Sequence, residues 1–286
     1  MGTVLIMKSY IFLSLCYLFS TVLQSAEFHS LLIAVRDNNT REIRKALKAG
    51  ADINGLTRKG FAPIHRAAIL GNYEALRELI NLDADIFARS FEGATILHLI
   101  ARANHAEILS KLLKSGLFVN YINAIDDHGR TALHYAVSQD SYESVLVLLV
   151  HRARVNKLDN LNLAPLHLAA RHDSARTARL LLQYDANPDI QTVMNNSPLH
   201  LAAYNNSADV ARILLEFDAS VNKQNWYANT PLHIASERNY LKIIEILIYY
   251  NASFVSKDFY GKTPVDYANL KTAETMHDMR MKITRK

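Results

Sequence analysis

Apolar residues recur along this chain in short blocks with helical spacing. One block places Val210, Ile213 and Leu214 at positions i, i+3 and i+4, and the same spacing returns 33 residues later between Ile243 and Leu247. Residues at this spacing share one face of an α-helix. The pattern therefore predicts a series of amphipathic helices, each burying one apolar stripe.

A second, shorter helix is predicted before each of these blocks, and a histidine phrase marks its start. Thr230-Pro231-Leu232-His233 is a representative copy, in which threonine suits the N-cap and proline suits the first helical position. The histidine then falls where a capping box would carry glutamate. The phrase recurs after 33, 36, 33, 33 and 33 residues, so the predicted capping residues are His65, His98, His134, His167, His200 and His233. A seventh copy ends in Asp266, whose charge suits a helix N-terminus.

Residues that tolerate a left-handed backbone mark both helix ends of each repeat. The first helix is predicted to stop at Gly71, Asn104, Asp140, Asp173, Asn206 and Asn239. The second stop falls at Asp83, Gly116, Arg152, Asp185, Asp218 and Asn251. Because an arginine is costly in this conformation, we expect an altered turn at Arg152.

An extended finger is predicted between the helix pairs. Its start is marked by Asn54, Asn120, Asn156 and Asn222, and its tight turn by Gly60, Gly93, Gly129 and Gly261. The single spacing of 36 residues places three extra residues between Gly116 and Gly129, around Tyr121-Ile122-Asn123. Insertions in repeat proteins normally enter loops.

The chain resembles the ankyrin-repeat family over about residues 28 to 270. The 33-residue period, the Thr-Pro-Leu-His phrase, the following Ala169-Ala170 and Ala202-Ala203, and the Gly-Ala-Asp-Ile-Asn of residues 50–54 all match that family's pattern. The resemblance implies an all-α ankyrin-repeat solenoid of stacked helix-turn-helix pairs with β-hairpin-like fingers. The expected segments are an N-terminal capping repeat (27–56), six repeats (57–89, 90–125, 126–158, 159–191, 192–224 and 225–257), a C-terminal capping repeat (258–274) and a basic tail (275–286).

The same resemblance implies protein binding along a concave face and no catalysis by the repeats. Composition agrees with a folded array, since 50% of residues are apolar and 21% are charged. We expect a monomer with a protein partner, without a nucleic-acid or small-molecule ligand. Part of the modest net charge of +5 lies in the tail. We interpret these charges as a solvated C-terminus, and the alternative is a contact with nucleic acid or a membrane.

The regular histidines could instead form a metal ladder, but their spacing argues against it. Equivalent residues in stacked helices lie about 8–10 Å apart, whereas zinc requires each histidine nitrogen within about 2 Å. The sequence contains no nucleophile elbow, zinc-protease helix or phosphate loop, and the pair Asp126-Asp127 reads as solvated turn chemistry. We therefore predict no catalytic residues, no metal and no cofactor.

The N-terminus differs in kind from the repeats. Lys8 precedes a charge-free run from Ser9 to Ala26, and small residues at Ser25-Ala26 fit a secretory signal peptide (1–26). An uncleaved anchor over residues 9–25 and a buried helix remain alternatives. The chain's single cysteine, Cys16, lies in this run, so a mature chain would have no thiol. Repeats behind such a signal resemble exported ankyrin-repeat proteins of intracellular bacteria, and we expect a secreted or periplasmic chain or, with the anchor retained, a membrane-bound one.

The finger tips are the candidate partner surface. Towards the C-terminus they become apolar and aromatic, whereas loop tips are normally polar. The predicted contact residues are Trp226, Tyr227, Phe259, Tyr260, Met194, Val193 and Leu161, with Tyr204 and Arg171 on the adjoining helices. The alternative is that the tips pack on one another along the row. We predict an exported, non-enzymatic protein-interaction scaffold; the alternative is a membrane-tethered structural scaffold that keeps residues 9–25.

Overall fold

Short helices account for all regular secondary structure that the computed structural model describes, which covers residues 26–284. These residues divide into two units, one ending at Ala103 and one beginning at Asn104. The all-α class with stacked helix pairs is confirmed. Within this range no helix is both long and apolar enough to cross a bilayer. The predicted anchor (9–25) lies outside the described residues, and so does the predicted signal peptide (1–26) apart from Ala26.

The N-terminal unit contains a helical segment over 26–36 and four labelled helices. These are α2 (Thr40–Lys48), α3 (Pro63–Leu70), α4 (Tyr73–Asn81) and α5 (Ile96–Arg102). Asn39 caps α2 by accepting from the Glu42 amide at 3.2 Å. Asn38 accepts from the Ala75 amide at 2.8 Å, so the first loop is fixed to α4.

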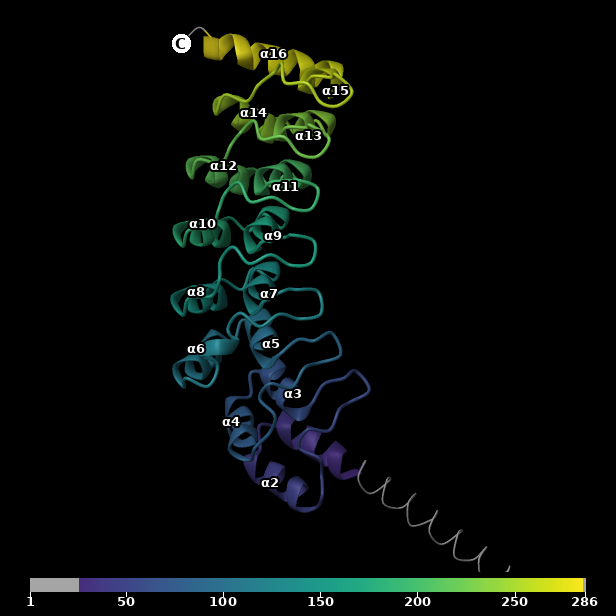
Figure 1. The fold of residues 1–286 in the computed structure, drawn as a ribbon, viewed down its shortest axis with the longest axis vertical. Helices are drawn as coiled ribbons and strands as arrows, with labels where there is room; N and C mark the ends of the chain where they lie inside the picture. The colour runs from purple at the N-terminus through teal and green to yellow at the C-terminus, as the bar shows by residue number, and fades with distance from the viewer. Residues whose placement is uncertain (1–25, 285–286) are drawn as a thin grey trace, which may run out of the picture. The chain divides into compact units, whose positions relative to one another are not determined.

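The C-terminal unit continues the pattern with alternating first and second helices. The elements are α6 (Ala106–Lys114), η1 (Val119–Tyr121), α7 (Ala132–Ser138), α8 (Tyr142–Val150), α9 (Pro165–Arg171), α10 (Ala175–Gln183), α11 (Pro198–Asn205), α12 (Ala208–Glu216), α13 (Pro231–Glu237), α14 (Leu241–Tyr249), α15 (Pro264–Tyr267) and α16 (Leu270–Thr284). Figure 1 shows the first helices α7, α9, α11 and α13 in one column and the second helices α8, α10, α12 and α14 in another. The fingers project from the side of the first helices.

The core lies between neighbouring helix pairs. Leu181, Leu214 and Leu247 occupy one position in α10, α12 and α14, and all three are fully buried. Burying a leucine side chain contributes about 1.5–3 kcal/mol. The first helices instead bury small side chains such as Ala169 and Ala202, which let successive helices pack closely. Each repeat therefore completes its core only against its neighbours.

The predicted helix stops have the expected left-handed backbone. Asn104, Asp173 and Asn206, for example, have φ between 53° and 60°. Arg152 has φ 65° as well, so our expectation of an altered turn there is wrong. Its amide donates to the Leu149 carbonyl at 2.9 Å, and the Ala153 amide donates to Leu148 at 2.9 Å. The same two hydrogen bonds are made at the stops Asp83, Asp185, Asp218 and Asn251. At Arg152 they outweigh the conformational cost of about 1–2 kcal/mol.

The three-residue insertion forms the short helix η1. Phe118, just before it, is only 1% exposed and anchors the insertion in the core. Asn123, not the predicted Asn120, marks the finger start, since its Oδ1 accepts from the Arg154 amide at 2.8 Å. Asn156 makes the corresponding bond to the Asn187 amide with the same separation of 31 residues. The extra residues therefore precede Asn123, and the repeat register resumes there.

A long helix closes the C-terminal unit. Residues 275–284, which we expected to form a basic tail, continue α16 from Leu270 to Thr284. Asn269 caps this helix by accepting from the Thr272 amide at 2.8 Å. Met276 is fully buried, and its sulfur accepts a hydrogen bond from the Ser236 hydroxyl at 3.5 Å. One apolar contact and one cap thus extend helical structure past the predicted boundary at 274.

Candidate protein-binding surface

Five of the repeat histidines join their own helix start to the following segment, and His98 makes the same contacts with its helix start. In the copy at His233, Nδ1 accepts from the Thr230 amide at 3.1 Å and from the Thr230 hydroxyl at 2.8 Å. With Nδ1 accepting, Nε2 carries the proton and donates to the Lys262 carbonyl at 3.2 Å. The equivalent Nε2 bonds, each to a carbonyl 29 residues further on, run from His134 to Leu163, His167 to Asn196 and His200 to Asn229. His65 donates instead to the Ala88 carbonyl, 23 residues further on.

The hydrogen bonds at the helix N-terminus depend on the N-cap residue, which differs between repeats. Ala62 and Ala164 have no hydroxyl, so only their amides reach the ring, each at 3.0 Å. At the seventh copy, Asp266 accepts from both the amide and the hydroxyl of Thr263, at 2.7 and 2.8 Å. A carboxylate thus replaces the imidazole at this helix start, where a negative charge is favourable.

Burial keeps the histidine rings neutral. It lowers the pKa of His167 and of His200 to about 4, because the charged imidazolium would lose its hydration. The pKa values of His65, His134 and His233 are lowered for the same reason. In these five rings both nitrogens are already used inside the fold. Among residues 26–284, no three metal-ligand side chains converge on one point.

A side chain at the base of each finger fixes the finger turn. Asp159 is representative, since its Oδ1 accepts from the amides of Leu161 and Leu163, both at 2.8 Å. The same double contact is made by Asp126, Asn225 and Asp258, and by the Thr192 hydroxyl. Sequence reasoning missed this position, although acid, amide or hydroxyl at the first residue of successive repeats was its signal.

Asp126 is not the solvated turn residue that we expected. It is 2% exposed, and its carboxylate binds the Arg130 guanidinium at 2.7 Å and the Tyr135 hydroxyl at 2.9 Å. Burial raises the pKa of Asp126, but the hydrogen bonds from Arg130 and Tyr135 outweigh burial and leave the pKa below its usual range. A tyrosine nine residues further on also donates its hydroxyl to Asp258, since Tyr267 binds that carboxylate as Tyr135 binds Asp126. These acids therefore support the finger base.

Backbone hydrogen bonds join consecutive fingers of the C-terminal unit into a row. The Trp226 amide donates to the Met194 carbonyl at 3.0 Å, and the Phe259 amide donates to Tyr227 at 3.1 Å. The same bond links Val193 to Leu161 at 3.3 Å. The fingers approach so closely that a Cβ on Gly129 would lie 3.0 Å from the Asn160 amide nitrogen. The tips are consequently held at fixed spacing.

The side chains of the predicted contact residues remain accessible on this row. Trp226 is 58% exposed and Tyr260 is 77% exposed. Leu161, Val193, Met194, Tyr227 and Phe259 are also exposed. Backbone hydrogen bonds thus join neighbouring tips, while between 39% and 77% of each of these apolar side chains stays exposed.

The two predicted helix residues lie at the C-terminal ends of the first helices. Arg171 ends α9 and is exposed, and Tyr204 lies near the end of α11. Arg238, which follows α13, places its guanidinium 3.7 Å from the centre of the Tyr204 ring. This cation–π contact fixes one face of the ring. Arg238 comes 34 residues after Tyr204, which is about one repeat, so the repeat register indicates that the two residues lie in neighbouring repeats.

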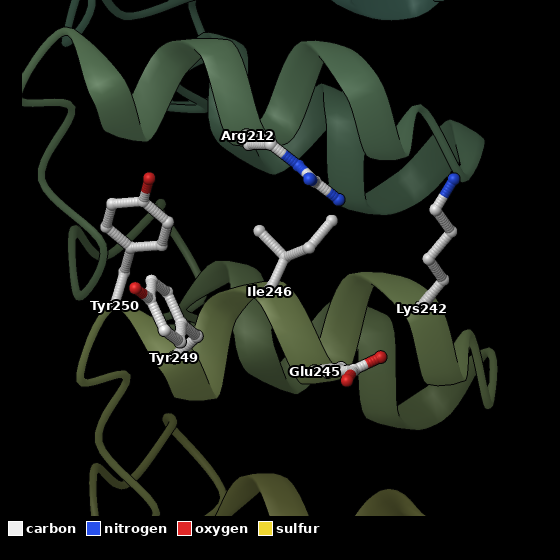
Figure 2. A pocket seen from close by; sticks show the side chains of 6 residues that line it. All are labelled: Arg212, Lys242, Glu245, Ile246, Tyr249 and Tyr250. Atoms are coloured by element: carbon white, nitrogen blue, oxygen red, sulfur yellow. The ribbon is translucent and has the colours of Figure 1, made fainter.

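A separate pocket lies on the second helices, and the sequence analysis did not anticipate it. Its volume is about 380 Å³, and it is lined by Arg212, Lys242, Glu245, Ile246, Tyr249 and Tyr250. Figure 2 shows these side chains extending from α12, from α14 and from Tyr250, which caps the C-terminus of α14. Lys242 pairs with Asp209 at 3.7 Å, and the two tyrosine rings meet edge to face. The lining thus mixes charged and aromatic groups.

Repeated helix pairs, capping histidines and hydrogen-bonded fingers define a class of repeat proteins. In this class each repeat packs only on its neighbouring repeats, and the stacked repeats together form extended binding surfaces. Comparison with family models identifies ankyrin repeats at residues 59–91, 84–159, 146–225 and 166–258. The chain belongs to the ankyrin repeat family. Domains of this family are protein–protein interaction scaffolds and typically non-enzymatic modules.

Relatives and solved structures agree with this assignment. The chain is 33% identical over 126 residues to human neurogenic locus notch homolog protein 2, covering 43% of this chain and 5% of that protein. It is 38% identical over 87 residues to human ankyrin repeat and SOCS box protein 3, covering 29% and 17%. The chain thus spans a small part of these relatives.

Two solved ankyrin repeat domains share the fold. The human ASB11 domain matches with a TM-score of 0.68 and 26% identity, covering 77% of this chain and 98% of that one. The domain of Bcl-3, described as a unique member of the IkappaB protein family, matches with a TM-score of 0.68 and 27% identity, covering 77% and 100%.

Proposed function

We propose that the chain is an exported scaffold that binds a partner protein through the finger tips of its C-terminal unit. The observation that carries this proposal is the exposure of Trp226, Tyr227, Phe259 and Tyr260 on fingers whose backbones are fixed by hydrogen bonds. Rigid aromatic side chains lose little conformational entropy on binding and are enriched at energetic centres of interfaces. Met194, Val193 and Leu161 extend the apolar surface, and Tyr204 and Arg171 border it.

The binding proposal is tested by Trp226→Ala/Tyr227→Ala. Extracts from candidate host cells or from the cell envelope supply the partner, which is captured on the wild-type chain, identified and titrated calorimetrically. We expect the double variant to weaken binding by at least about 2 kcal/mol while helicity stays unchanged. Asp127→Ala/His128→Ala occupies the same tip positions three fingers earlier and is the matched control. Equal affinity of both double variants for the identified partner would rule out this surface.

Export rests on the sequence of residues 1–26 and is tested separately. N-terminal sequencing of the chain recovered from its native source distinguishes the two forms. A mature chain that starts at Ala26 or Glu27 supports a cleaved signal peptide. A chain that starts at Met1 in the membrane fraction supports the alternative scaffold tethered by residues 9–25.

A further inference from the structure

One apolar patch in the C-terminal unit lies away from the fingers. It consists of five exposed side chains, Leu117, Val119, Tyr121, Leu146 and Val150, which we call the η1 patch. Three of them lie in or beside η1, and the other two lie on α8. Exposed apolar clusters of this kind mark binding sites more often than single exposed residues do.

The α8 members of the patch depart from the pattern of the second helices. Leu146 and Val150 occupy two outward positions one helical turn apart, where a solvent-facing helix normally carries polar residues. The equivalent pairs in this unit are Ser110 and Lys114, Arg179 and Gln183, Arg212 and Glu216, and Glu245 and Tyr249. Of these second helices, α8 carries aliphatic residues at both outward positions. The packing of the core does not require aliphatic residues there.

The insertion supplies the rest of the patch in the preceding repeat. Phe118 is buried and anchors the segment, while Val119 beside it is 61% exposed. Helix α6 packs along α8, so the segment that follows α6 adjoins the end of α8. The hydrogen bond from the Arg154 amide to Asn123 Oδ1 holds the two following loops together. The packing of α6 along α8 and this hydrogen bond therefore bring the insertion near the C-terminal end of α8, where Val150 lies.

Three cations lie within four residues of a patch member in the sequence, and they have no acidic partner among the described residues. Lys114, Arg152 and Arg154 are exposed, and none forms an ion pair within residues 26–284. Arg152 also holds the left-handed conformation that the other five repeats give to Gly, Asn or Asp. A residue that costs backbone stability at this position adds a positive charge to the border.

We propose that the η1 patch binds an amphipathic α-helix of a partner protein that carries acidic residues beside its apolar stripe. Leu146 and Val150 form an i, i+4 ridge, the arrangement that packs into the groove of another helix. Val119 and Leu117 extend the apolar contact, and the unpaired cations complement acidic side chains on the partner. The site lies on the second helices and the adjoining loop, so it is independent of the finger surface.

A display library of amphipathic helices tests the proposal on the full chain. Each peptide has about five helical turns and a fixed apolar stripe, and its flanking positions vary between glutamate and lysine. We expect glutamate-rich peptides to be enriched and to bind the purified chain more weakly as salt rises. Val119→Asp/Val150→Asp should raise the Kd of an enriched peptide at least about tenfold. Gln183→Asp, one repeat after Val150 on the same helix face, should leave the Kd unchanged.

Arg152→Asn separates binding from folding. Asparagine tolerates the left-handed backbone, so this variant should raise the urea midpoint of unfolding while it weakens binding of the enriched peptide. A binding loss with increased stability cannot result from misfolding. Trp226→Ala/Tyr227→Ala should leave peptide binding unchanged, so failure of the finger proposal and failure of this one are distinguishable.

Four results would overturn the proposal. They are enrichment without a preference for glutamate, equal peptide binding by wild type and Val119→Asp/Val150→Asp, sedimentation with phosphatidylserine vesicles that this variant abolishes, and self-association that it abolishes. The last two would assign the patch to a lipid surface or to a second copy of the chain.

Discussion

The imidazole of His167 donates from Nε2 to the carbonyl oxygen of Asn196 at 3.1 Å, which joins two consecutive repeats. The same ring accepts the Ala164 amide on Nδ1 at 3.0 Å. One buried side chain therefore caps a helix and fixes the next finger. Because the fingers carry the proposed contact residues, the histidines contribute to binding indirectly, through finger position.

His167→Ala should destabilise the fold substantially. The change removes two hydrogen bonds and leaves a cavity at a fully buried position, so we expect a loss of about 2–4 kcal/mol. Urea unfolding followed by circular dichroism measures the change. His172→Ala, at an exposed position in the same repeat, is the control and should shift the midpoint little. Similar midpoints for the two variants would contradict the capping role.

Stability should decrease as the pH falls from about 6.5 towards 4. Burial lowers the pKa of His167 and of His200 to about 4, whereas an unfolded histidine titrates near 6.5. The unfolded chain therefore binds more protons in this window, and the full stability is present above it. Each of these two residues should account for about 3 kcal/mol. Urea titrations at a series of pH values check the slope, which should flatten in His167→Ala/His200→Ala.

Phe118→Ala should release the insertion from the core. Phe118 is fully buried beside η1, so its truncation should cost about 3–5 kcal/mol. Its neighbour Val119 faces solvent, and Val119→Ala should change the free energy of unfolding by less than about 0.5 kcal/mol. Calorimetric or urea unfolding of both variants gives the comparison. A small effect of Phe118→Ala would mean that the insertion does not depend on this anchor.

Asp126→Ala should destabilise the finger that contains Asp126 and that is hydrogen-bonded to the next finger through the Asn160 amide. The carboxylate is buried and binds Arg130, Tyr135 and two backbone amides, so its loss leaves several donors unsatisfied. Breaking a buried pair of this kind costs about 3–5 kcal/mol; because Arg130 is partly exposed, we expect the lower end. Asp127→Ala, beside it at the exposed tip, provides the control for urea unfolding. Equal stability of the two variants would show that the network contributes nothing.

The periodic parts of the fold were predictable because each repeat meets the same neighbours. The histidine phrase located the helix starts, and glycine, asparagine and aspartate located the left-handed stops. Predictions failed where one tertiary contact outweighed local preference. Backbone hydrogen bonds hold Arg152 in an unfavourable conformation, and buried Met276 extends α16 beyond the predicted boundary.

The candidate surface was only partly predictable. Sequence register located the exposed tips, but not the contact between Arg238 and Tyr204, which depends on side chains from two repeats. The burial of Asp126 was not predicted, because the sequence does not show which of two adjacent acids is buried. In the structure Asp126 is buried and Asp127 is exposed. The pocket likewise depends on two repeats, because Arg212 of α12 faces residues of α14 and its C-terminal cap.

Ala228→Gly should stabilise the finger that presents Trp226 and Tyr227. Ala228 has φ 58°, a left-handed conformation that costs an ordinary residue about 1–2 kcal/mol, whereas glycine adopts it freely. We expect a net gain of about 1 kcal/mol in urea unfolding, with the tip geometry unchanged. Gly261 holds the equivalent position one finger later with φ 72°, and a Cβ there would meet no atom within 4 Å. Gly261→Ala should therefore lose a similar free energy through backbone strain alone. Changes of the same sign in the two variants would show that this backbone conformation does not limit finger stability.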